Sequence, residues 1–126
     1  MAVLKNWSLV FNRRDWTTEN ASEVQFELCR CLSIGLPPED VECYNGFQIS
    51  GFVFDRPGFK DGDYVITSII KKWTTKSGKN VAIRGESWIV TTKSGSTYEL
   101  PINDASEDQK NLIDKVADII VNRVFA

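Results

Sequence analysis

Hydrophobic and polar residues alternate over several stretches of this chain, which is the pattern of half-buried β-strands. Residues 4–11, LKNWSLVF, are rich in aromatic and branched side chains and predict a first strand. In residues 23–33, EVQFELCRCLS, the apolar residues Val24, Phe26 and Leu28 alternate with polar ones. This period of two predicts a second strand.

A short helix is the alternative for residues 23–33, because Ser22 and Gln25 have the spacing of a helix capping box. A pair of prolines follows, and the Asn-Gly pair at residues 45–46 is typical of a tight turn. We therefore expect residues 34–46 to form a connection that ends in a turn.

The period of two is clearest over residues 47–100. Turn signals divide this part of the chain: Arg-Pro-Gly-Phe at 56–59, Asp-Gly at 61–62 and Ser-Gly at 94–95. Each of these pairs or quartets favours a reversal of the backbone between two strands. The strands that we expect are residues 47–54, 64–73, 81–84, 88–93 and 96–100.

The pattern changes near the C-terminus. Ser106 and Gln109 form a capping box, and Glu107 and Asp108 stand in the first turn, where the helix dipole favours acidic residues. Apolar residues then recur at steps of three and four, which predicts an amphipathic helix over residues 106–124. The apolar stripe consists of Leu112, Ile113, Val116, Ile119, Ile120 and Val124.

Together these elements predict an α+β fold. We expect a mainly antiparallel β-sheet meander of five to seven strands, followed by one long C-terminal amphipathic helix. The length of 126 residues suits a single domain over residues 1–126, with a β-rich part over residues 1–102.

The C-terminal helix also predicts a homo-oligomer, a dimer or larger. Val121 and Phe125 widen its apolar stripe beyond what one sheet face covers, and Ala117 lets a neighbour approach closely. Trp73 and Trp88 are expected in the core or in the interface between subunits. A monomer whose helix packs wholly on its own sheet is the alternative.

Composition and charge narrow the function. The chain has 15 basic and 17 acidic residues, a net charge of −2, so general DNA or RNA binding is not expected. The N-terminus lacks the apolar run of a signal peptide, and no stretch approaches the ~20 apolar residues that span a bilayer. We therefore expect a cytoplasmic protein that does not bind membranes.

The chain contains no histidine, which excludes Ser-His-Asp and Cys-His catalysis as they are usually built. It also lacks the glycine-rich phosphate-binding motifs of nucleotide enzymes. Cys29, Cys31 and Cys43 are expected to be reduced, and a structural zinc site wants four ligands that this chain does not offer in a usual pattern. We therefore expect no cofactor, no metal and no enzymatic activity.

Residues 54–68, FDRPGFKDGDYVITS, are the candidate binding region. A nucleotide needs an aromatic face for its base, a guanidinium for its phosphate, and hydroxyl groups for the rest. Arg56 and Phe59 offer the first two in one turn. The neighbouring residues that we expect to complete the site in a meander are Thr67, Ser68, Thr91, Thr92, Ser94 and Tyr98.

Each of these residues also has a structural interpretation. Arg56 would form an ion pair with Asp55, Asp61 or Asp63, and Phe59 would fold onto the core. The two aspartates at 61 and 63 would serve the turn, with a bound cation as the alternative. The threonines and serines would form the polar outer face of the sheet.

Three stretches carry a resemblance to a known group of proteins. LKNWSLV at residues 4–10, SGFVFDRPGFKDGDYVITSII at 50–70 and VTTKSGSTYEL at 90–100 resemble, in the same order, short uncharacterised proteins of bacteria, their phages and mobile elements. The resemblance implies a phage or prophage origin. By analogy of fold, the chain is also similar to small phage proteins that sequester nucleotide signals of bacterial immune systems such as Thoeris.

The resulting hypothesis is a non-catalytic phage or prophage anti-defence protein that binds and sequesters a small nucleotide immune signal. The first alternative is a protein-interaction module, either an inhibitor of a host enzyme or a component of phage assembly. The second is a metal-dependent hydrolase that uses Asp61 and Asp63.

Overall fold

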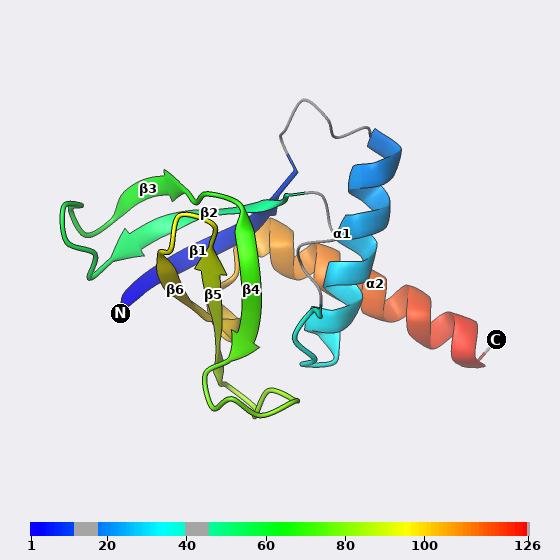
Figure 1. The fold of residues 1–126 in the computed structure, drawn as a ribbon. Helices are drawn as coiled ribbons and strands as arrows, with labels where there is room; N and C mark the ends of the chain where they lie inside the picture. Colours follow the sequence, from blue (N-terminus) through cyan, green and yellow to red (C-terminus); the bar gives the residue numbers. More distant parts are fainter. Residues whose placement is uncertain (12–17, 40–45, 126) are drawn as a thin grey trace.

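The protein folds as an α+β structure with one mixed, mostly antiparallel six-stranded sheet and two α-helices (Figure 1). The structure, a computed structural model, describes residues 1–11, 18–39 and 46–125, and of residues 18–20 and 123–125 only the backbone. Its elements are β1 Ala2–Val10, α1 Thr18–Ser33, β2 Gln48–Phe54, β3 Asp63–Ile66, β4 Ile70–Thr75, β5 Ser87–Thr92, β6 Thr97–Pro101, the 3-10 helix η2 Ile102–Asp104 and α2 Glu107–Phe125.

The strand order is β3-β2-β1-β6-β5-β4. All neighbours are antiparallel except β1 and β6, which run parallel with Ala2 opposite Tyr98 and Val3 opposite Glu99. The predicted mainly antiparallel sheet and C-terminal helix are confirmed. The meander, however, is split into two three-stranded halves, β1–β2–β3 and β4–β5–β6, which the parallel pair joins.

The sheet is strongly curled. Strands β3 and β4 lie at opposite ends of the strand order, yet only residues 67–69 connect them. In a flat sheet six strands place the edges about 24 Å apart, whereas this connection spans at most about 14 Å. A hydrogen bond closes the gap, because the N–H of Ile70, the first residue of β4, donates to the carbonyl of Phe47, next to β2, at 3.1 Å.

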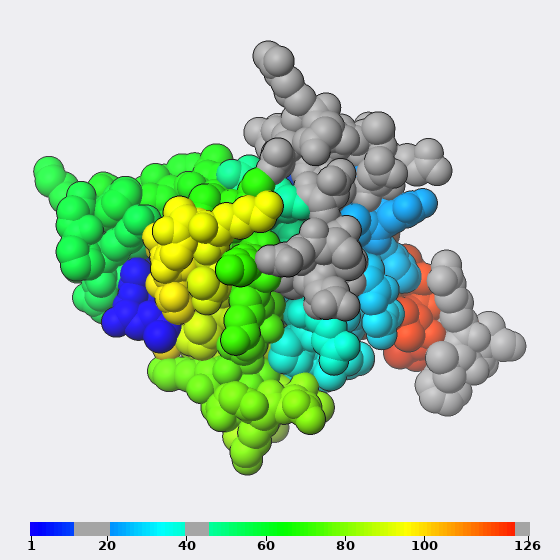
Figure 2. All heavy atoms as spheres, in the orientation of Figure 1, coloured from blue at the N-terminus to red at the C-terminus, as the bar shows by residue number. Residues whose placement is uncertain are grey.

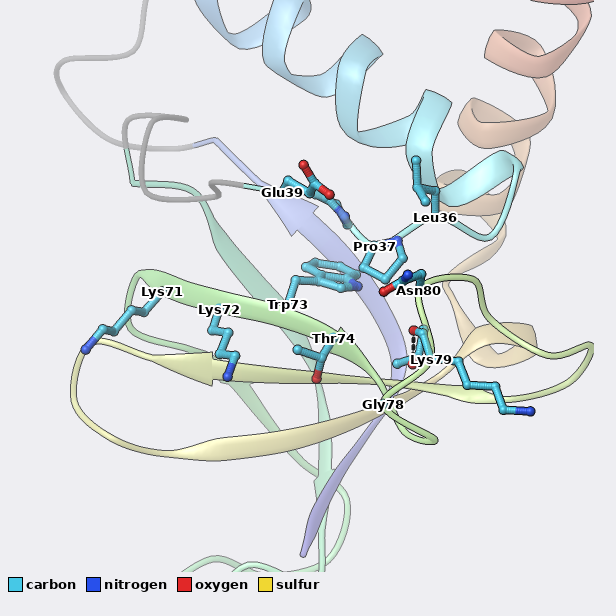
Figure 3. Close-up of a pocket in the computed structure, with 12 residues that line it drawn as sticks. Leu36, Pro37, Glu39, Lys71, Lys72, Trp73, Thr74, Gly78, Lys79 and Asn80 are labelled. Carbon is cyan, nitrogen blue, oxygen red and sulfur yellow. Dashed lines mark hydrogen bonds between the residues drawn. The ribbon is translucent and has the colours of Figure 1, made fainter.

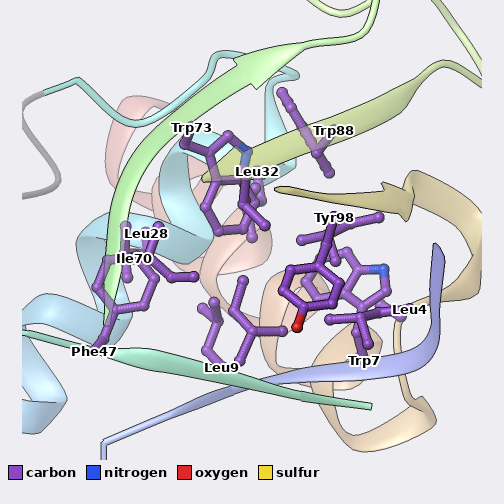
Figure 4. Close-up of a cluster of buried hydrophobic side chains, with 14 of the residues drawn as sticks. Leu4, Trp7, Leu9, Leu28, Leu32, Phe47, Ile70, Trp73, Trp88 and Tyr98 are labelled. Atoms are coloured by element: carbon purple, nitrogen blue, oxygen red, sulfur yellow. The ribbon is translucent and has the colours of Figure 1, made fainter. Parts of the chain in front are cut away.

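The core fills the inside of the curled sheet. Trp73 is central to it, with ring centroids 6.3 Å from Trp7 and 6.0 Å from Trp88, both edge to face (Figure 4). Trp73 and Trp88 were expected in the core or in a subunit interface, and both lie in the core. Helix α1 adds Leu28 and Leu32 to the same cluster, so the helix covers an open side of the sheet.

Helix α1 corrects the strand predicted for residues 23–33. The alternation there is short, and the buried Leu28 and Leu32 are four residues apart, so the helical spacing places both on the core side. Glu27 and Arg30 form an ion pair at 2.5 Å across one turn. The helix alternative was therefore correct, although α1 begins at Thr18, before the proposed cap at Ser22.

Two other strand predictions are also wrong. The strand expected over residues 64–73 is broken at 67–69, where the chain crosses from one sheet edge to the other. Residues 81–84 form a loop, because the N–H of Ala82 donates to the carbonyl of Gly35 at 2.7 Å, beyond the end of α1, and not to a strand.

Helix α2 begins at the predicted cap. The Oγ of Ser106 accepts a hydrogen bond from the N–H of Gln109 at 3.1 Å. The side chain of Gln109 does not return to Ser106, as a capping box requires, but reaches into the core. Its Oε1 accepts from the N–H of Leu9 at 2.9 Å, and its Nε2 donates to Cys29 Sγ at 3.6 Å. Helix α2 then runs against α1 (Figure 1).

The described thiols are inert groups of the interior. Cys29 and Cys31 are free and buried, and burial raises the pKa of Cys29 to about 11. Cys43 and the predicted turn residue Asn45 lie outside the described residues, and nothing is described of the side chains of Val124 and Phe125. Among the described residues, neither helix combines the length and the apolar character that crossing a bilayer requires.

Candidate functional site

The loop between β2 and β3 carries the candidate site, and its own carboxylates shape it. Asp61 Oδ1 accepts a hydrogen bond from the N–H of Asp55 at 2.9 Å, and Asp63 Oδ2 accepts from the N–H of Lys60 at 3.1 Å. Gly62, at a φ of 91°, needs the left-handed conformation that glycine permits. The aspartates at 61 and 63 thus hold the turn, as the structural interpretation expected.

Arg56 lies between two aromatic rings. Its guanidinium carbon is 4.4 Å from the ring centroid of Phe59 and 5.3 Å from that of Tyr98. One terminal nitrogen donates to the Tyr98 hydroxyl, and the other to Ser96 Oγ at 3.5 Å. We call these four residues, Arg56, Phe59, Ser96 and Tyr98, the Arg56 cluster.

The positive charge of the Arg56 cluster is not neutralised by a neighbour. Within residues 1–11, 18–39 and 46–125, Arg56 forms no ion pair, so the pairs considered with Asp55, Asp61 or Asp63 are not formed. A guanidinium carries five N–H donors and stays charged at any physiological pH. Arg56 is half-buried and Phe59 is 42% exposed, so both the charge and one ring remain reachable from solvent.

A group of hydroxyls lies beside the Arg56 cluster. Ser94 Oγ is 2.9 Å from both Ser68 Oγ and Thr92 Oγ1, which ties the β5–β6 turn to the connection between β3 and β4. On the molecular surface the yellow residues of this turn adjoin the green residues of that connection (Figure 2). Thr92 Oγ1 also accepts from the N–H of Ser96 at 3.2 Å, so the hydroxyl group and the Arg56 cluster are continuous.

Two of the predicted site residues lie elsewhere. Thr67 is buried, where its Oγ1 accepts from the N–H of Ile49 at 3.1 Å and donates to the carbonyl of Ser68 at 2.8 Å. Thr91 alternates with the buried Val90 and Thr92, so its side chain points to the opposite face of the sheet. Both positions serve the sheet rather than the cluster.

Ser96 belongs to the cluster but was not among the predicted residues. Its place in the hydroxyl-rich run of residues 91–97 was the available signal. The turn at Ser94 and Gly95 decides that Ser96, rather than Thr91, faces Arg56.

An exposed apolar patch covers the outer face of the neighbouring strands. Phe52 on β2 and Tyr64 on β3 stack edge to face with centroids 5.6 Å apart, and Ile66 continues the patch. All three side chains are more than a third exposed. Contiguous apolar surface of this kind marks interaction sites on many proteins.

The described part of the chain contains no set of side chains that could bind a metal ion. No three of its Cys, Asp and Glu side chains gather closely enough to hold an ion. The carboxylates of Asp61 and Asp63, which the hydrolase hypothesis requires, each hold a backbone N–H.

Comparisons of the chain with protein-family models, curated proteins and solved structures give no match. The geometry of the Arg56 cluster and its surroundings is therefore the observation that bears on function.

Proposed function

We propose that this protein binds a small nucleotide at the Arg56 cluster and holds it without chemical turnover. One observation carries the proposal: a charged guanidinium lies between two aromatic rings and has no carboxylate partner in the described structure. Arginine in this setting binds phosphate through paired N–H donors.

The surrounding groups suit the other parts of a nucleotide. The exposed ring of Phe59 offers a face on which a base can stack, a contact worth about 1–3 kcal/mol per base. The hydroxyls of Ser68 and Ser94 can donate to phosphate or ribose oxygens. The β5–β6 turn carries Ser94 and Ser96, and Ser94 holds Ser68 of the β3–β4 connection at 2.9 Å, so the site is organised before the ligand arrives.

Sequestration is the role that we propose for this binding. A metal-dependent hydrolase would need further ligands beside Asp61 and Asp63, and no group of three Cys, Asp or Glu side chains that could hold an ion is found among the described residues. The phage or prophage setting rests on the sequence resemblance alone, and the immune signal rests on an analogy of fold. Both extend the proposal rather than support it.

A thermal shift screen with mono-, di- and cyclic nucleotides tests the proposal. A ligand present at 100 times its dissociation constant stabilises the fold by about 2.7 kcal/mol. Arg56→Ala should abolish the shift yet lower the free energy of unfolding by only about 1 kcal/mol, the scale of an exposed cation–π contact. Arg84→Ala removes an exposed arginine of the loop at residues 81–85 and is the matched control. If no nucleotide raises the melting temperature of the parent protein or of Arg84→Ala, nucleotide binding is rejected.

A protein-interaction module is the second candidate, and the patch of Phe52, Tyr64 and Ile66 favours it. In that case a partner protein would cover the outer face of β2 and β3. Tyr64→Lys would then abolish capture of the partner and leave any nucleotide shift unchanged, whereas Arg56→Ala would do the reverse.

A further inference from the structure

A groove runs along β4, away from the Arg56 cluster (Figure 3). Its volume is about 710 Å3, and its walls are residues 36–39, 71–75 and 78–80. Cavities of about 300–1,000 Å3 commonly hold ligands or anchoring side chains of partners.

The groove follows the edge of the sheet rather than one of its faces. Side chains of consecutive strand residues point to opposite faces, yet all of residues 71–75 line the groove. Strand β4 is the last in the strand order, so within the described structure this edge has no neighbouring strand. The groove therefore gives access to the backbone of β4.

The pairing with β5 shows which backbone groups are available. The N–H of Lys76 donates to the carbonyl of Ser87 at 3.0 Å, and the next hydrogen-bonded pair along an antiparallel ladder is Thr74 with Ile89. The intervening pairs do not exchange hydrogen bonds. The N–H and C=O of Trp73 therefore point away from β5, towards the groove.

The side chain of Trp73 connects the groove to the core. Trp73 is only 4% exposed, and its Nε1 is a buried polar atom without a hydrogen-bond partner among the described residues. The indole lines the groove, with its nitrogen drawn on the side of Pro37 and Asn80 (Figure 3). Because this nitrogen lies beneath the groove surface, a bound molecule does not contact it directly, but its resonance reports changes in the groove.

The charges of the groove indicate an acidic occupant. Lys71, Lys72 and Lys79 line it against the single carboxylate of Glu39, and no ion pair holds these lysines in the described residues. Lysines on an edge strand repel a second copy of the same edge, which argues against pairing between two of these chains. The same lysines attract a segment that carries carboxylates.

We propose that the free edge of β4 binds an extended acidic segment of another protein as an added strand. The backbone of that segment would exchange hydrogen bonds with the N–H and C=O of Trp73. Its carboxylates would reach Lys71, Lys72 and Lys79. This site is separate from the Arg56 cluster and does not depend on nucleotide binding.

Fluorescence anisotropy with a labelled ten-residue peptide tests the proposal. The probe has blocked termini and alternates Glu with Thr, which favours the extended state. We expect it to bind, and the same peptide with Lys in place of Glu not to bind. The double variant Lys71→Glu, Lys72→Glu should weaken binding at least about tenfold. Lys110→Glu, on an exposed face of α2, is the matched control and should leave the affinity unchanged.

Amide exchange followed by NMR distinguishes strand addition from a purely electrostatic attraction between the peptide and the lysines. On peptide binding, the backbone N–H of Trp73 should gain protection and its indole N–H should shift, while the already paired Thr74 changes little. Binding that survives the double variant, or that leaves Trp73 unprotected, overturns the proposal.

Two other results would also overturn it. One is an indole shift caused by inorganic phosphate or a nucleotide but not by the peptide, which would make the groove a small-anion site. The other is protection of Trp73 by self-association without peptide. Arg56→Ala should not change peptide affinity, so failure here and failure of nucleotide binding are distinguishable.

Discussion

Gln109 is the buried polar residue that joins α2 to the rest of the core. Its Oε1 accepts from the N–H of Leu9, a part of β1 that β6 does not reach, because β6 pairs only with Ala2 and Val3. The N–H of Ser106 likewise donates to the carbonyl of Trp7 at 2.8 Å. The start of α2 thus takes the place of a missing strand along this part of β1.

We expect Gln109→Leu to lower the free energy of unfolding by about 1–3 kcal/mol, the cost of leaving a buried N–H without a partner. Urea denaturation monitored by tryptophan fluorescence measures the change. Lys110→Ala, one residue further on the exposed side of α2, should change stability by less than about 0.5 kcal/mol. Equal stabilities of the Gln109 variant and the parent protein would contradict the argument.

At the scale of elements, the loop of residues 76–86 is held by one carboxylate. The side chain of Glu86 accepts from the N–H of Ser77 at 2.5 Å and from that of Ile83 at 2.6 Å. These hydrogen bonds lower the pKa of Glu86 from the usual 4.5 to about 2, and those with Ser77 have the largest effect. The loop forms one end of the β4 groove, so its order bears on that site.

This loop should therefore loosen in acid. A depressed pKa in the folded state means that the contribution is present above pH 4.5 and is lost as the pH falls from about 4.5 to about 2. The protection factors of the Ser77 and Ile83 amides, which compare each exchange rate with the intrinsic rate at the same pH, should fall over that range. In Glu86→Gln both protection factors should already be low at neutral pH and should change little on acidification. Protection factors that stay constant from about pH 6 to about pH 2 in the parent protein would refute the role of Glu86.

Helix α1 packs on the sheet through buried side chains, of which Leu28 is the largest that is fully buried. Leu28 has no exposed surface and belongs to the cluster that fills the sheet. Leu28→Ala should lower the free energy of unfolding by about 2–5 kcal/mol, because removing a core leucine leaves a cavity. Glu23→Ala, on the exposed side of the same helix, is the control. A small loss from Leu28→Ala, measured in urea, would mean that α1 is not docked on the sheet.

At the scale of the whole molecule, the two helices bear on the predicted oligomer. Helix α1 covers part of the apolar stripe of α2, with Phe26 facing Leu112, Val116 and Ile119 across a shallow groove. Helix α1 therefore covers some of the apolar surface of α2 for which the sequence predicts a second subunit. Ile120 remains partly exposed, and Val121 is 51% exposed.

The homo-oligomer through α2 stays a prediction, now restricted to the part of the helix beyond its contact with α1. Sedimentation equilibrium at micromolar concentration should show a dimer or a larger species. Ile120→Asp should yield a folded monomer, because a charge in an apolar interface is costly to bury. Lys115→Asp changes a charge on the side of α2 that faces α1, and it should leave the number of subunits in the sedimenting species unchanged. A parent protein that sediments as a monomer ends this proposal.

Several parts of this protein follow from the sequence alone, because their signals are local. The alternation in β2, β5 and β6 and the cap at Ser106 act between residues a few positions apart, and each is found as expected. Arg56 and Phe59 also lie together in one tight turn, as their separation of three residues implies, although their stacking on each other was not predicted. Local turn chemistry also places Asp61 and Asp63.

Only the tertiary structure decided the features that depend on distant partners. Residues 23–33 satisfy both a strand and a helix pattern, and the core side of the curled sheet selects the helix by accepting Leu28 and Leu32. The break at residues 67–69 arises because the chain must cross between sheet edges that curl towards each other. The β4 groove was not predicted, since its walls come from residues 36–39, 71–75 and 78–80, which no local pattern relates. Long-range packing brings them together and leaves the edge of β4 open.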